Sequence, residues 1–572
     1  MTQVVAAIDA NEKQIADVFS DKYAFTIPPY QRPYAWEVQQ VNELIEDLLE
    51  AMDPKSYSQG LYFLGSIVLV KTPNIPDSKV VDGQQRLTTL TILFSVLRDL
   101  TENVRTKIKR DEYVKQPADD DRKLPERLRL HLRQRDQAFF AKTVQSEDAT
   151  QELPRLEGLE GSQARIVENA THLRKRLQDM GEEKRSELIS FILNHCYLVV
   201  VEVPTDTAAR RIFTVLNARG MDLTATDILK ADLLERAGED KEQELSTRWE
   251  NIELALDRKL FSDLFTHIRM IFQREKPRSA LELGFPEFVP SFKQASPENF
   301  ISDTLEPYAD SLELIEDNSK AAKLFGEQTA GLFRALNRLD NKDWVPPLML
   351  RLKLYADSKE DDDIYTFVKK LERLAYYLFI TRADVNARMN RYADVMESIS
   401  PTNDSKLKTA GLKFTKDEKF NLFDHLDGRI YLVTRIIKPL LLRLDMTFTS
   451  GSARYDYPII SVEHVCPQTI EEGSQWDDWY KNRDDHDEWL HRLGNLVLLN
   501  RRKNSAARNW DLEVKKEKYF AKDDLCPFLL TQQTLQVEEW TPEFLEERQY
   551  ELIGQFAKTW GLSKSFDKWM DT

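Results

Sequence analysis

Cysteines and long apolar runs are scarce in this sequence. Its 572 residues contain only three cysteines, Cys196, Cys466 and Cys526, with no CxxC pair and no Cys and His at zinc-finger spacing. A disulfide framework or a zinc module is therefore excluded. No stretch reaches the roughly 18 apolar residues that a membrane span needs. The opening MTQVVAAIDANEKQ lacks a basic segment followed by an apolar one, so we expect a soluble, cytoplasmic protein with no membrane partner.

An excess of positive charge is also missing. Lys and Arg number 80 against 96 Asp and Glu, which leaves a net charge of −16. Proteins that coat DNA without sequence preference depend on Lys and Arg to release counterions from the phosphates, so this class is excluded. Any DNA-binding surface must be local. Residues 122–135 hold six basic residues against one acidic, and residues 501–518 hold seven against three.

The length and the hydrophobic content of 41% are enough for three or four compact units, each with its own core. The patterning predicts an α+β protein that is predominantly helical. An N-terminal domain over residues 1–235 mixes strands and helices, and a middle domain over 236–445 reads as helix after helix. The domain over 446–572 differs in composition, because seven of the ten tryptophans lie in the last 97 residues, which suggests a separate core.

Apolar spacing predicts the elements of the N-terminal domain. Helical spacing covers residues 37–52 and 84–100, and β-branched or aromatic runs predict strands at 61–70 and 79–81. The order is therefore helix, hairpin, helix. In the highly charged segment that follows we expect a helix flanked by solvated loops. Residues 188–204 then pass from helical spacing into a β-branched run, which should add a buried strand.

A polar cluster stands where the second strand of the hairpin meets its helix. The sequence there is DGQQRLTTL, and it offers six candidate nucleotide-binding residues: Asp82, Gly83, Gln84, Gln85, Arg86 and Thr88. A glycine allows close backbone approach, and free N–H groups at a helix start bind anions, so the cluster suits a phosphate. Asp82 could recruit Mg²⁺ or activate water. The GxxxxGK[ST] loop is absent. The structural alternative is an ordinary Asp-Gly turn with solvated Gln and Arg side chains.

Two further segments are candidates to join this cluster. IPPYQRPYAW supplies Gln31, Arg32 and Tyr34, which are cationic and amide donors among aromatic residues. They could stack a base, although packing at a domain edge explains the same residue types. FTVLNARGMDLTATDILK supplies Asn217 and Arg219 between a helix stop and the cap of the next helix. These polar groups could also be scaffold only.

Three short pieces of the last domain form a second constellation. SVEHVCP and LGNLVLL each read as a strand with a functional group at one end, and Asn504 opens an amphipathic helix. Two strands and a helix would bring Glu463, His464, Asn495 and Asn504 together. Phosphodiester hydrolysis with one divalent cation suits this set, because a neutral imidazole deprotonates water while the metal polarises the phosphate. Glu463 and Asn504 offer hard oxygens for Mg²⁺, and Asn495 could hold the imidazole.

Each of these residues also has a plainer explanation. A single His at a strand end before a Pro is more often structural, and an Asn before a helix is more often only a cap. The joint pattern favours a nuclease. Glu-His-x-x-Pro, Gly-Asn-Leu and an Asn nine residues further on occur in that order on strand, strand and helix.

This second constellation resembles the ββα-metal HNH nuclease motif. By this resemblance His464 is the general base, Glu463 and Asn504 are the metal ligands, and Asn495 orients the histidine. Lys515 lies on the following helix at a position suited to the phosphate. Many proteins with this motif have His at the position of Asn504 and Asp at the position of Glu463. Asn and Glu both still offer an oxygen ligand or a donor there. The implied cofactor is Mg²⁺ or Mn²⁺.

Both ends of the chain together resemble the GmrSD-type modification-dependent (type IV) restriction endonucleases in their single-chain form. The anchors are IPPYQRPYAW, FLGSIVLV, DGQQRLTTL and FTVLNARGMDLTATDILK, followed by the HNH pieces. The resemblance implies a ParB-like domain at 1–235 that binds and hydrolyses a nucleoside triphosphate (GTP, CTP or ATP), a helical linker domain at 236–445 and an HNH domain at 446–572. The implied substrate is double-stranded phage DNA with modified bases, such as glucosylated hydroxymethylcytosine. Single-chain members accompany BREX phage-defence systems.

Other functions fit the same sequence. One is a nucleotide-gated DNA clamp or adaptor with an idle HNH fold, and another is a non-specific nuclease that kills the infected cell. A double-strand cut by a chain with one nuclease centre needs two passes or two chains, so we expect a homodimer.

Overall fold

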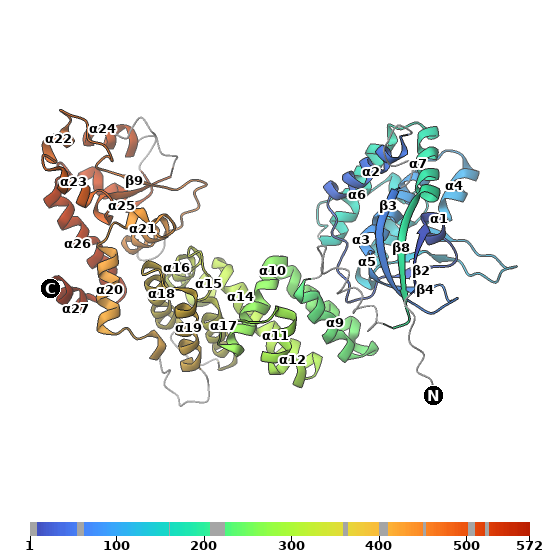
Figure 1. Ribbon diagram of the computed structural model, residues 1–572, viewed down its shortest axis with the longest axis horizontal. Coiled ribbons are helices and arrows are strands. Elements are labelled where there is room, and N and C mark those ends of the chain that lie inside the picture. Colours follow the sequence, from blue (N-terminus) through green and yellow to red (C-terminus); the bar gives the residue numbers. More distant parts are fainter. Residues whose placement is uncertain are drawn as a thin grey trace. The chain divides into compact units, whose positions relative to one another are not determined.

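The computed structural model describes residues 9–53, 62–159, 161–205, 224–358, 364–399, 410–449, 453–500, 510–520 and 526–572. The chain divides into two compact units, Met1–Leu254 and Ala255–Thr572. Helices predominate, and the first unit adds a mixed six-stranded sheet (Figure 1). The predicted class, α+β and predominantly helical, is therefore confirmed. Of the described helices, none is long and apolar enough to cross a membrane.

A mixed sheet organises the first unit. Its spatial order is β1 (Asp9–Gln14), β8 (Cys196–Val203), β3 (Tyr62–Lys71), β4 (Asp77–Asp82), β2 (Ala24–Thr26) and β7 (Leu130–His131). β3 pairs antiparallel with β4 and parallel with β8. The predicted hairpin and the predicted late strand are both confirmed, because the hairpin becomes β3 and β4 and the late strand becomes β8 beside β3.

The described residues of the first unit form eight α-helices besides the start of α10. They are α1 (Ile15–Val18), α2 (Val38–Met52), α3 (Gln84–Asp99), α4 (Val104–Asp111), α5 (Gln134–Phe140), α6 (Gly161–Gln178), α7 (Glu182–His195) and α9 (Ala225–Ala237); α10 (Glu239–Gln273) runs across the boundary between the units. Every residue of α3 from Leu87 to Asp99 is buried, and the helix contacts α4, α6 and α7. The predicted helices at 37–52 and 84–100 are confirmed as α2 and α3.

The basic segment of residues 127–131 is extended. It forms β6 (Arg127–Leu128) and β7, and β6 pairs with β5 (Lys115–Gln116). Arg and Leu alternate here, and alternation with a period of two is typical of a strand. The charged region does contain helices, α4 before this segment in sequence and α5 and α6 after it, and the basic run between them forms strands.

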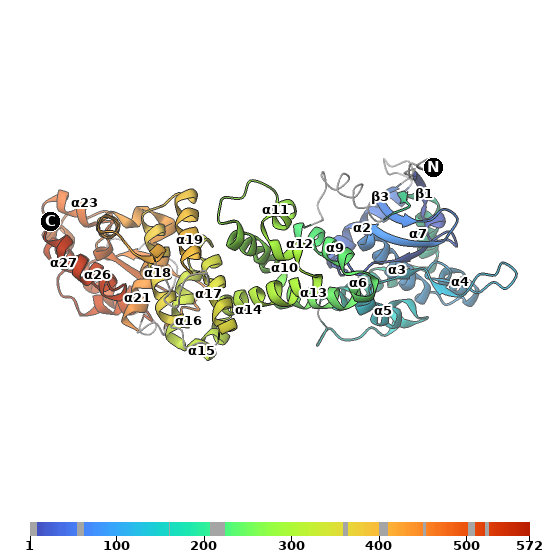
Figure 2. The same ribbon diagram turned by 90° about the horizontal axis from the view of Figure 1, so that it is seen from below.

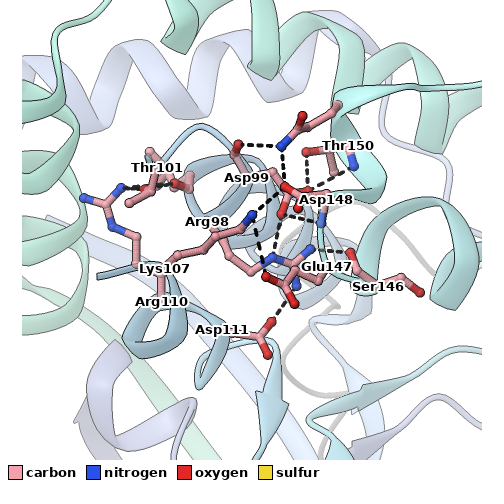
Figure 3. Close-up of polar contacts among 12 residues, drawn as sticks. Arg98, Asp99, Thr101, Lys107, Arg110, Asp111, Ser146, Glu147, Asp148 and Thr150 are labelled. Carbon is pink, nitrogen blue, oxygen red and sulfur yellow. Dashed lines mark hydrogen bonds and ion pairs between the residues drawn. The ribbon is translucent and has the colours of Figure 1, made fainter. Parts of the chain in front are cut away.

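The C-terminal end of α3 is fixed by a buried polar network, which Figure 3 shows. The side chains of Arg98 and Asp99 are fully buried, and Arg98 Nε donates to Asp99 Oδ1 over 2.6 Å. Arg98 also donates to Asp111 Oδ1 at 2.6 Å, and Asp99 Oδ2 accepts from the backbone N–H and the hydroxyl of Thr150. Buried charges persist where such partners satisfy them. The network ties η1 (Ala141–Gln145) and η2 (Ala149–Gln151) to the helix that begins at the DGQQR cluster.

The second unit begins with a long run of helices. Between α9 and residue 449 the described elements are all helical, as predicted for the middle of the chain: α11 (Leu281–Phe288), α12 (Pro290–Gln294), α13 (Pro297–Phe300), η3 (Ile301–Leu305), α14 (Glu306–Glu316), α15 (Asn318–Phe325), α16 (Glu327–Asn337), α17 (Val345–Ser358), α18 (Ile364–Ile380), α19 (Val385–Ile399), η4 (Ala410–Leu412), α20 (Lys416–Leu426), η5 (Ile430–Leu432) and α21 (Thr434–Phe448).

Short elements follow toward the C-terminus. They are β9 (Ser461–His464), α22 (Gln475–Trp479), α23 (Arg483–Trp489), η6 (Leu493–Asn495), β10 (Leu496–Leu499), α24 (Leu512–Lys515), η8 (Lys516–Phe520), α25 (Leu529–Gln532), η9 (Gln533–Gln536), α26 (Pro542–Thr559) and α27 (Ser563–Met570). The helix α26 lies against α21 and α27 (Figure 2).

The tryptophan-rich tail and the helical run share part of their core. Trp560 follows α26 and is buried, and its Nε1 donates to Glu372 Oε2 of α18 at 2.9 Å. The other oxygen of Glu372 accepts from Arg443 Nε of α21 at 2.6 Å. The predicted domain boundaries at 235/236 and 445/446 remain predictions.

Candidate active site

The two strands predicted to carry the nuclease residues do pair. β9 and β10 are antiparallel, with His464 opposite Leu496 and Glu463 opposite Val497. Every residue of β10 is buried, which explains the unbroken apolar sequence LVLL. Glu463 is 8% exposed and His464 is 3% exposed at the end of β9. α24 follows β10 in sequence, so the order is strand, strand, helix. The predicted start of this helix at Asn504 is wrong, because Trp510 and Asp511 are not helical and Asp511 is the N-cap of α24.

Three side chains surround the imidazole of His464. Gln468 Nε2 lies 3.2 Å from His464 Nδ1, and His491 Nδ1 lies 3.2 Å from His464 Nε2. The Tyr431 ring packs against the same imidazole with 4.1 Å between ring centroids. An amide nitrogen can only donate, so this geometry suits the tautomer of His464 in which Nδ1 accepts and Nε2 carries the proton. Both ring nitrogens of the predicted base therefore have a defined partner.

His491 is suited to accept that proton because it is held neutral. Burial lowers its pKa, and electrostatic interactions with Arg429 and His486 lower it further, whereas Asp487 raises it. A neutral imidazole keeps one nitrogen as an acceptor. The sequence prediction missed His491. A histidine three residues before Gly494, in HRLGNL, was the available signal.

Asn495 does contact the segment that carries the base. It is fully buried, and its Oδ1 accepts from Cys466 N at 2.7 Å and from Trp540 Nε1 at 3.1 Å. Its Nδ2 donates to Cys466 O at 3.2 Å and to Leu490 O at 3.0 Å. These contacts are with the backbone two residues beyond His464 and with the residue before His491. They fix the backbone on both sides of the imidazole pair.

Lys515 points inward toward the backbone at the end of β9. Its Nζ donates to Val465 O at 2.7 Å and to His464 O at 3.4 Å, and the ammonium lies 5.5 Å from the centroid of the Trp476 ring. Burial lowers its pKa to about 8, while the Glu463 carboxylate opposes that shift. Lys515 thus places a buried positive group beside the predicted metal ligand and the predicted base.

The turn before β10 is held by α26. Gly494 N donates to Gln549 Oε1 at 2.7 Å, and Arg548 Nε donates to Gly494 O at 3.0 Å. A Cβ at Gly494 would lie 2.9 Å from Leu545 O, so a side chain does not fit. Glycine is therefore required by the close approach of a helix backbone.

The donors of the predicted metal site are only partly described. Glu463 supplies a carboxylate next to the predicted base, which is chemistry that suits Mg²⁺ or Mn²⁺. Asn504 lies outside the described residues, as do Asn217 and Arg219 of the N-terminal prediction. Among the described residues no group of three or more His, Cys, Asp and Glu side chains is gathered as a metal site.

The N-terminal cluster sits on a tight strand-to-helix turn. β4 ends at Asp82, Gly83 has φ +93°, and α3 begins at Gln84. A Cβ at Gly83 would lie 2.3 Å from Cγ2 of Ile67, so only glycine fits. The N-cap Gly83 has no side chain to cap the first N–H groups of α3, which leaves the helix start suited to an anion.

Arg86 lies beside Asp82 and over β3. Its Nη1 donates to Ser66 O at 3.0 Å, and a Cβ at Gly65 would come within 3.0 Å of its Nη2. Burial lowers the pKa of Arg86, and the charge of Asp82 opposes that shift. An acidic and a basic group therefore meet at the start of α3.

Several predicted nucleotide-binding residues hold the IPPYQRPYAW segment against α3. Gln31 Nε2 donates to Val81 O at 2.7 Å, and Tyr34 OH lies 2.8 Å from Thr89 Oγ1. Gln85 Oε1 accepts from Ala35 N at 2.8 Å. Thr88 Oγ1 donates to Gln84 O, within the helix. The side chains of Gln31, Tyr34, Gln85 and Thr88 therefore make structural contacts here.

Arg32 joins the segment to α9. Its Nε donates to Asp227 Oδ2 at 2.6 Å, and the same oxygen accepts from the backbone N–H of Thr224 at 2.9 Å. The neighbouring Pro29 O accepts from Lys230 Nζ at 3.1 Å, and Lys230 pairs with buried Glu250 at 2.9 Å. These anchors from α9 and α10 were not among the predicted site residues.

Two of the six basic residues in 122–135 are buried and form ion pairs inside the first unit. Arg133 pairs with Asp136 and Glu250, each at 2.6 Å, and Arg129 pairs with Asp21 at 3.2 Å. Arg129 and Arg133 are both buried. Their charges are neutralised within the fold, so they do not add to a DNA-binding surface.

Comparison with protein families matches both ends of the chain. A model of the N-terminal domain of GmrSD restriction endonucleases matches residues 15–234, and a model of their C-terminal domain matches residues 414–555. The two matches span the DGQQR cluster and the β9–β10 site, and they define the chain as a DNA restriction enzyme. It belongs to the GmrSD-type restriction endonuclease family. Comparison with curated proteins gave no match.

Proposed function

We propose that this chain is a nucleotide-regulated, divalent-metal-dependent HNH endonuclease that cleaves double-stranded phage DNA carrying modified bases. The observation that carries the proposal is the imidazole of His464, which lies at the end of β9 beside Glu463 with its two ring nitrogens in defined hydrogen bonds. A neutral, oriented imidazole is what a general base in phosphodiester hydrolysis requires.

The roles of the residues follow from their positions. His464 Nδ1 takes the proton of the attacking water once that water replaces the Gln468 amide. Glu463, together with Asn504, would hold Mg²⁺ or Mn²⁺. The bound cation would polarise the phosphate and stabilise the leaving oxygen. Lys515 holds the carbonyls of His464 and Val465 and adds positive charge behind the site.

The start of α3 is proposed as the nucleotide site. Its first N–H groups, Gly83 and Arg86 favour a phosphate, and Asp82 is the candidate for binding Mg²⁺ or activating water. The nucleotide would be GTP, CTP or ATP. We expect Asp82→Ala and Arg86→Ala to lower nucleotide hydrolysis, and unchanged hydrolysis in both variants would place that site elsewhere.

One digestion experiment tests the nuclease. Phage DNA with glucosylated hydroxymethylcytosine and the same DNA without the modification are incubated with wild type and His464→Ala, with Mg²⁺ or Mn²⁺, and with or without each nucleotide. Wild type should cut the modified DNA and spare the plain DNA, and His464→Ala should cut neither. Equal cutting by both proteins would remove His464 as the base. Equal cutting of both DNAs would favour a non-specific nuclease.

The proposed assembly is a homodimer, since each chain offers one nuclease centre and a double-strand cut needs two. Light scattering on the full chain gives its mass in solution. A single-chain mass both with and without DNA would contradict this part of the proposal.

A further inference from the structure

His464 and His491 form a pair of imidazoles held by a third ring. The Nε2 of His464 and the Nδ1 of His491 are 3.2 Å apart. Tyr431 is stacked on His491 with an interplanar angle of 7° and 5.4 Å between ring centroids, and its centroid lies 4.1 Å from that of His464. The backbone N–H of Tyr431 also donates to His491 O at 3.1 Å. The position of His491 is therefore fixed through both its ring and its backbone.

The tautomer of His464 decides whether it can act as a base. A neutral imidazole has one nitrogen that donates and one that accepts. Only the nitrogen without the proton can take a proton from water, and the partner at the other nitrogen selects which one that is. In this site Gln468 faces Nδ1 as a donor and His491 faces Nε2.

We propose that His491 is a positioning residue for the nuclease: its Nδ1 accepts the Nε2 proton of His464 and thereby keeps the Nδ1 lone pair of His464 available for water. The Gln468 amide occupies that lone pair until water replaces it. The inference rests on the proposed function, because it assigns a role in the same reaction. Asn495 and His491 then have different roles: Asn495 fixes the backbone beyond His464, and His491 selects the tautomer of His464.

Two substitutions separate tautomer selection from packing. His491→Phe keeps an aromatic ring for Tyr431 but has no acceptor. His491→Asn loses the ring but keeps an amide oxygen near the place of Nδ1. A role in tautomer selection predicts that Asn preserves activity better than Phe, whereas a role in packing alone predicts the reverse. His425→Phe is a matched control, because His425 is a half-buried histidine of α20 whose Nδ1 contacts the backbone of its own helix.

Steady-state cleavage of the modified phage DNA is the first measurement. His491→Phe should lower kcat about 10- to 100-fold, as expected for a residue that orients a catalytic group, and leave KM for DNA unchanged. His491→Asn should recover most of that loss, and His425→Phe should match wild type. Circular dichroism and thermal unfolding confirm that each variant is folded. If His491→Phe cleaves as fast as wild type, or if Asn is the slower of the two, the inference is overturned.

A second measurement does not depend on cleavage. Two-bond ¹H–¹⁵N spectra of ¹⁵N-histidine-labelled full chain report which imidazole nitrogen carries the proton. We expect the Nε2–H form of His464 in wild type and in His491→Asn, and a mixture in His491→Phe. A predominant Nδ1–H form in wild type would overturn the inference even where the enzyme is active. Failure of wild type to cut DNA, in contrast, would reject the proposed function while these spectra still decide the relation between the two histidines.

Discussion

The side chain of Asn495 pairs with both backbone groups of Cys466, accepting from its N–H at 2.7 Å and donating to its carbonyl at 3.2 Å. This contact imitates a backbone pair between strands and continues the β9–β10 pairing beyond His464. The segment that follows His464 is therefore held by an amide that both accepts and donates.

We predict that Asn495→Asp abolishes cleavage and destabilises the second unit. A carboxylate would face the carbonyls of Cys466 and Leu490, to which the amide now donates, and would lose both hydrogen bonds at a cost of about 3 kcal/mol or more. Thermal unfolding and DNA cleavage measure the two effects. Asn103→Asp is the control, because the exposed Asn103 caps α4 as an acceptor of the Thr106 N–H and hydroxyl, and Asp caps a helix equally well. Wild-type stability in Asn495→Asp would contradict the donor role.

Gly83→Ala should destabilise the first unit by about 2–4 kcal/mol, since overpacking adds to the strain of a left-handed residue. The new Cβ would lie 2.3 Å from Ile67 Cγ2. Gly158→Ala is a matched control, because Gly158 has φ +83° and nothing within 4 Å of its Cβ position, so this variant has the strain without the clash. Chemical unfolding gives both values. Equal losses in the two variants would show that the contact with Ile67 is unimportant.

The network of Figure 3 predicts a large effect of Asp99→Ala. Arg98 Nε and the backbone N–H of Thr150 both donate to Asp99, and both lose this acceptor in the variant. Removing one partner of a buried ion pair typically lowers the free energy of unfolding by about 3–5 kcal/mol. Glu46→Ala breaks an exposed pair with Arg176 in the same unit, and such pairs contribute at most about 1 kcal/mol. Urea unfolding of the two variants should differ accordingly, and similar losses would contradict the structural role of Asp99.

His267 predicts a pH dependence of stability. Burial, with a smaller contribution from Lys342, lowers its pKa to about 4, whereas an unfolded histidine titrates near about 6.5. The unfolded chain therefore binds the proton first as the pH falls, so the stability that His267 contributes is complete above pH ~6.5 and is lost progressively toward pH ~4. The variant His267→Gln should lose less stability than wild type between pH 7.5 and pH 5, with a difference of up to about 2 kcal/mol. If urea unfolding shows that both proteins lose the same stability between pH 7.5 and pH 5, the pKa of His267 is not lowered by burial.

Sequence patterns predicted the helices and strands more accurately than they predicted which side chains contact one another. The hairpin of β3 and β4, the helices α2 and α3 and the late strand β8 follow directly from apolar spacing. The strands around Arg127 and Arg129 were not predicted, although Arg and Leu alternate there with the period of two that is typical of a strand. Charge alone does not reveal a partner, and the acidic residues that neutralise Arg129 and Arg133 are Asp21, Asp136 and Glu250, two of them more than 100 positions away.

In the two candidate sites, too, sequence motifs predicted the elements but not all of the side-chain contacts. Motif spacing predicted two paired strands that carry Glu463, His464 and Asn495. β9 does pair with β10, and Asn495 lies in the turn η6 directly before β10, where its side chain contacts the backbone of Cys466. Motif spacing did not predict His491, Gln468 or Tyr431 around the imidazole, because their approach depends on how η5, α23 and the loop after β9 fold together. It also left open whether Gln31, Tyr34 and Gln85 contact a ligand or the protein, and their described contacts lie within the protein.

By itself, the sequence determined the periodicity of most elements and the order of two polar constellations along the chain. These properties are local, since they depend on neighbours a few residues apart. Only the tertiary structure decided which side chains meet: His491 with His464, Lys515 with the carbonyl of Val465, and Arg98 with Asp99 and Asp111. The physical reason is that hydrogen-bond partners and the burial that strengthens them come from segments distant in sequence, which no local pattern records.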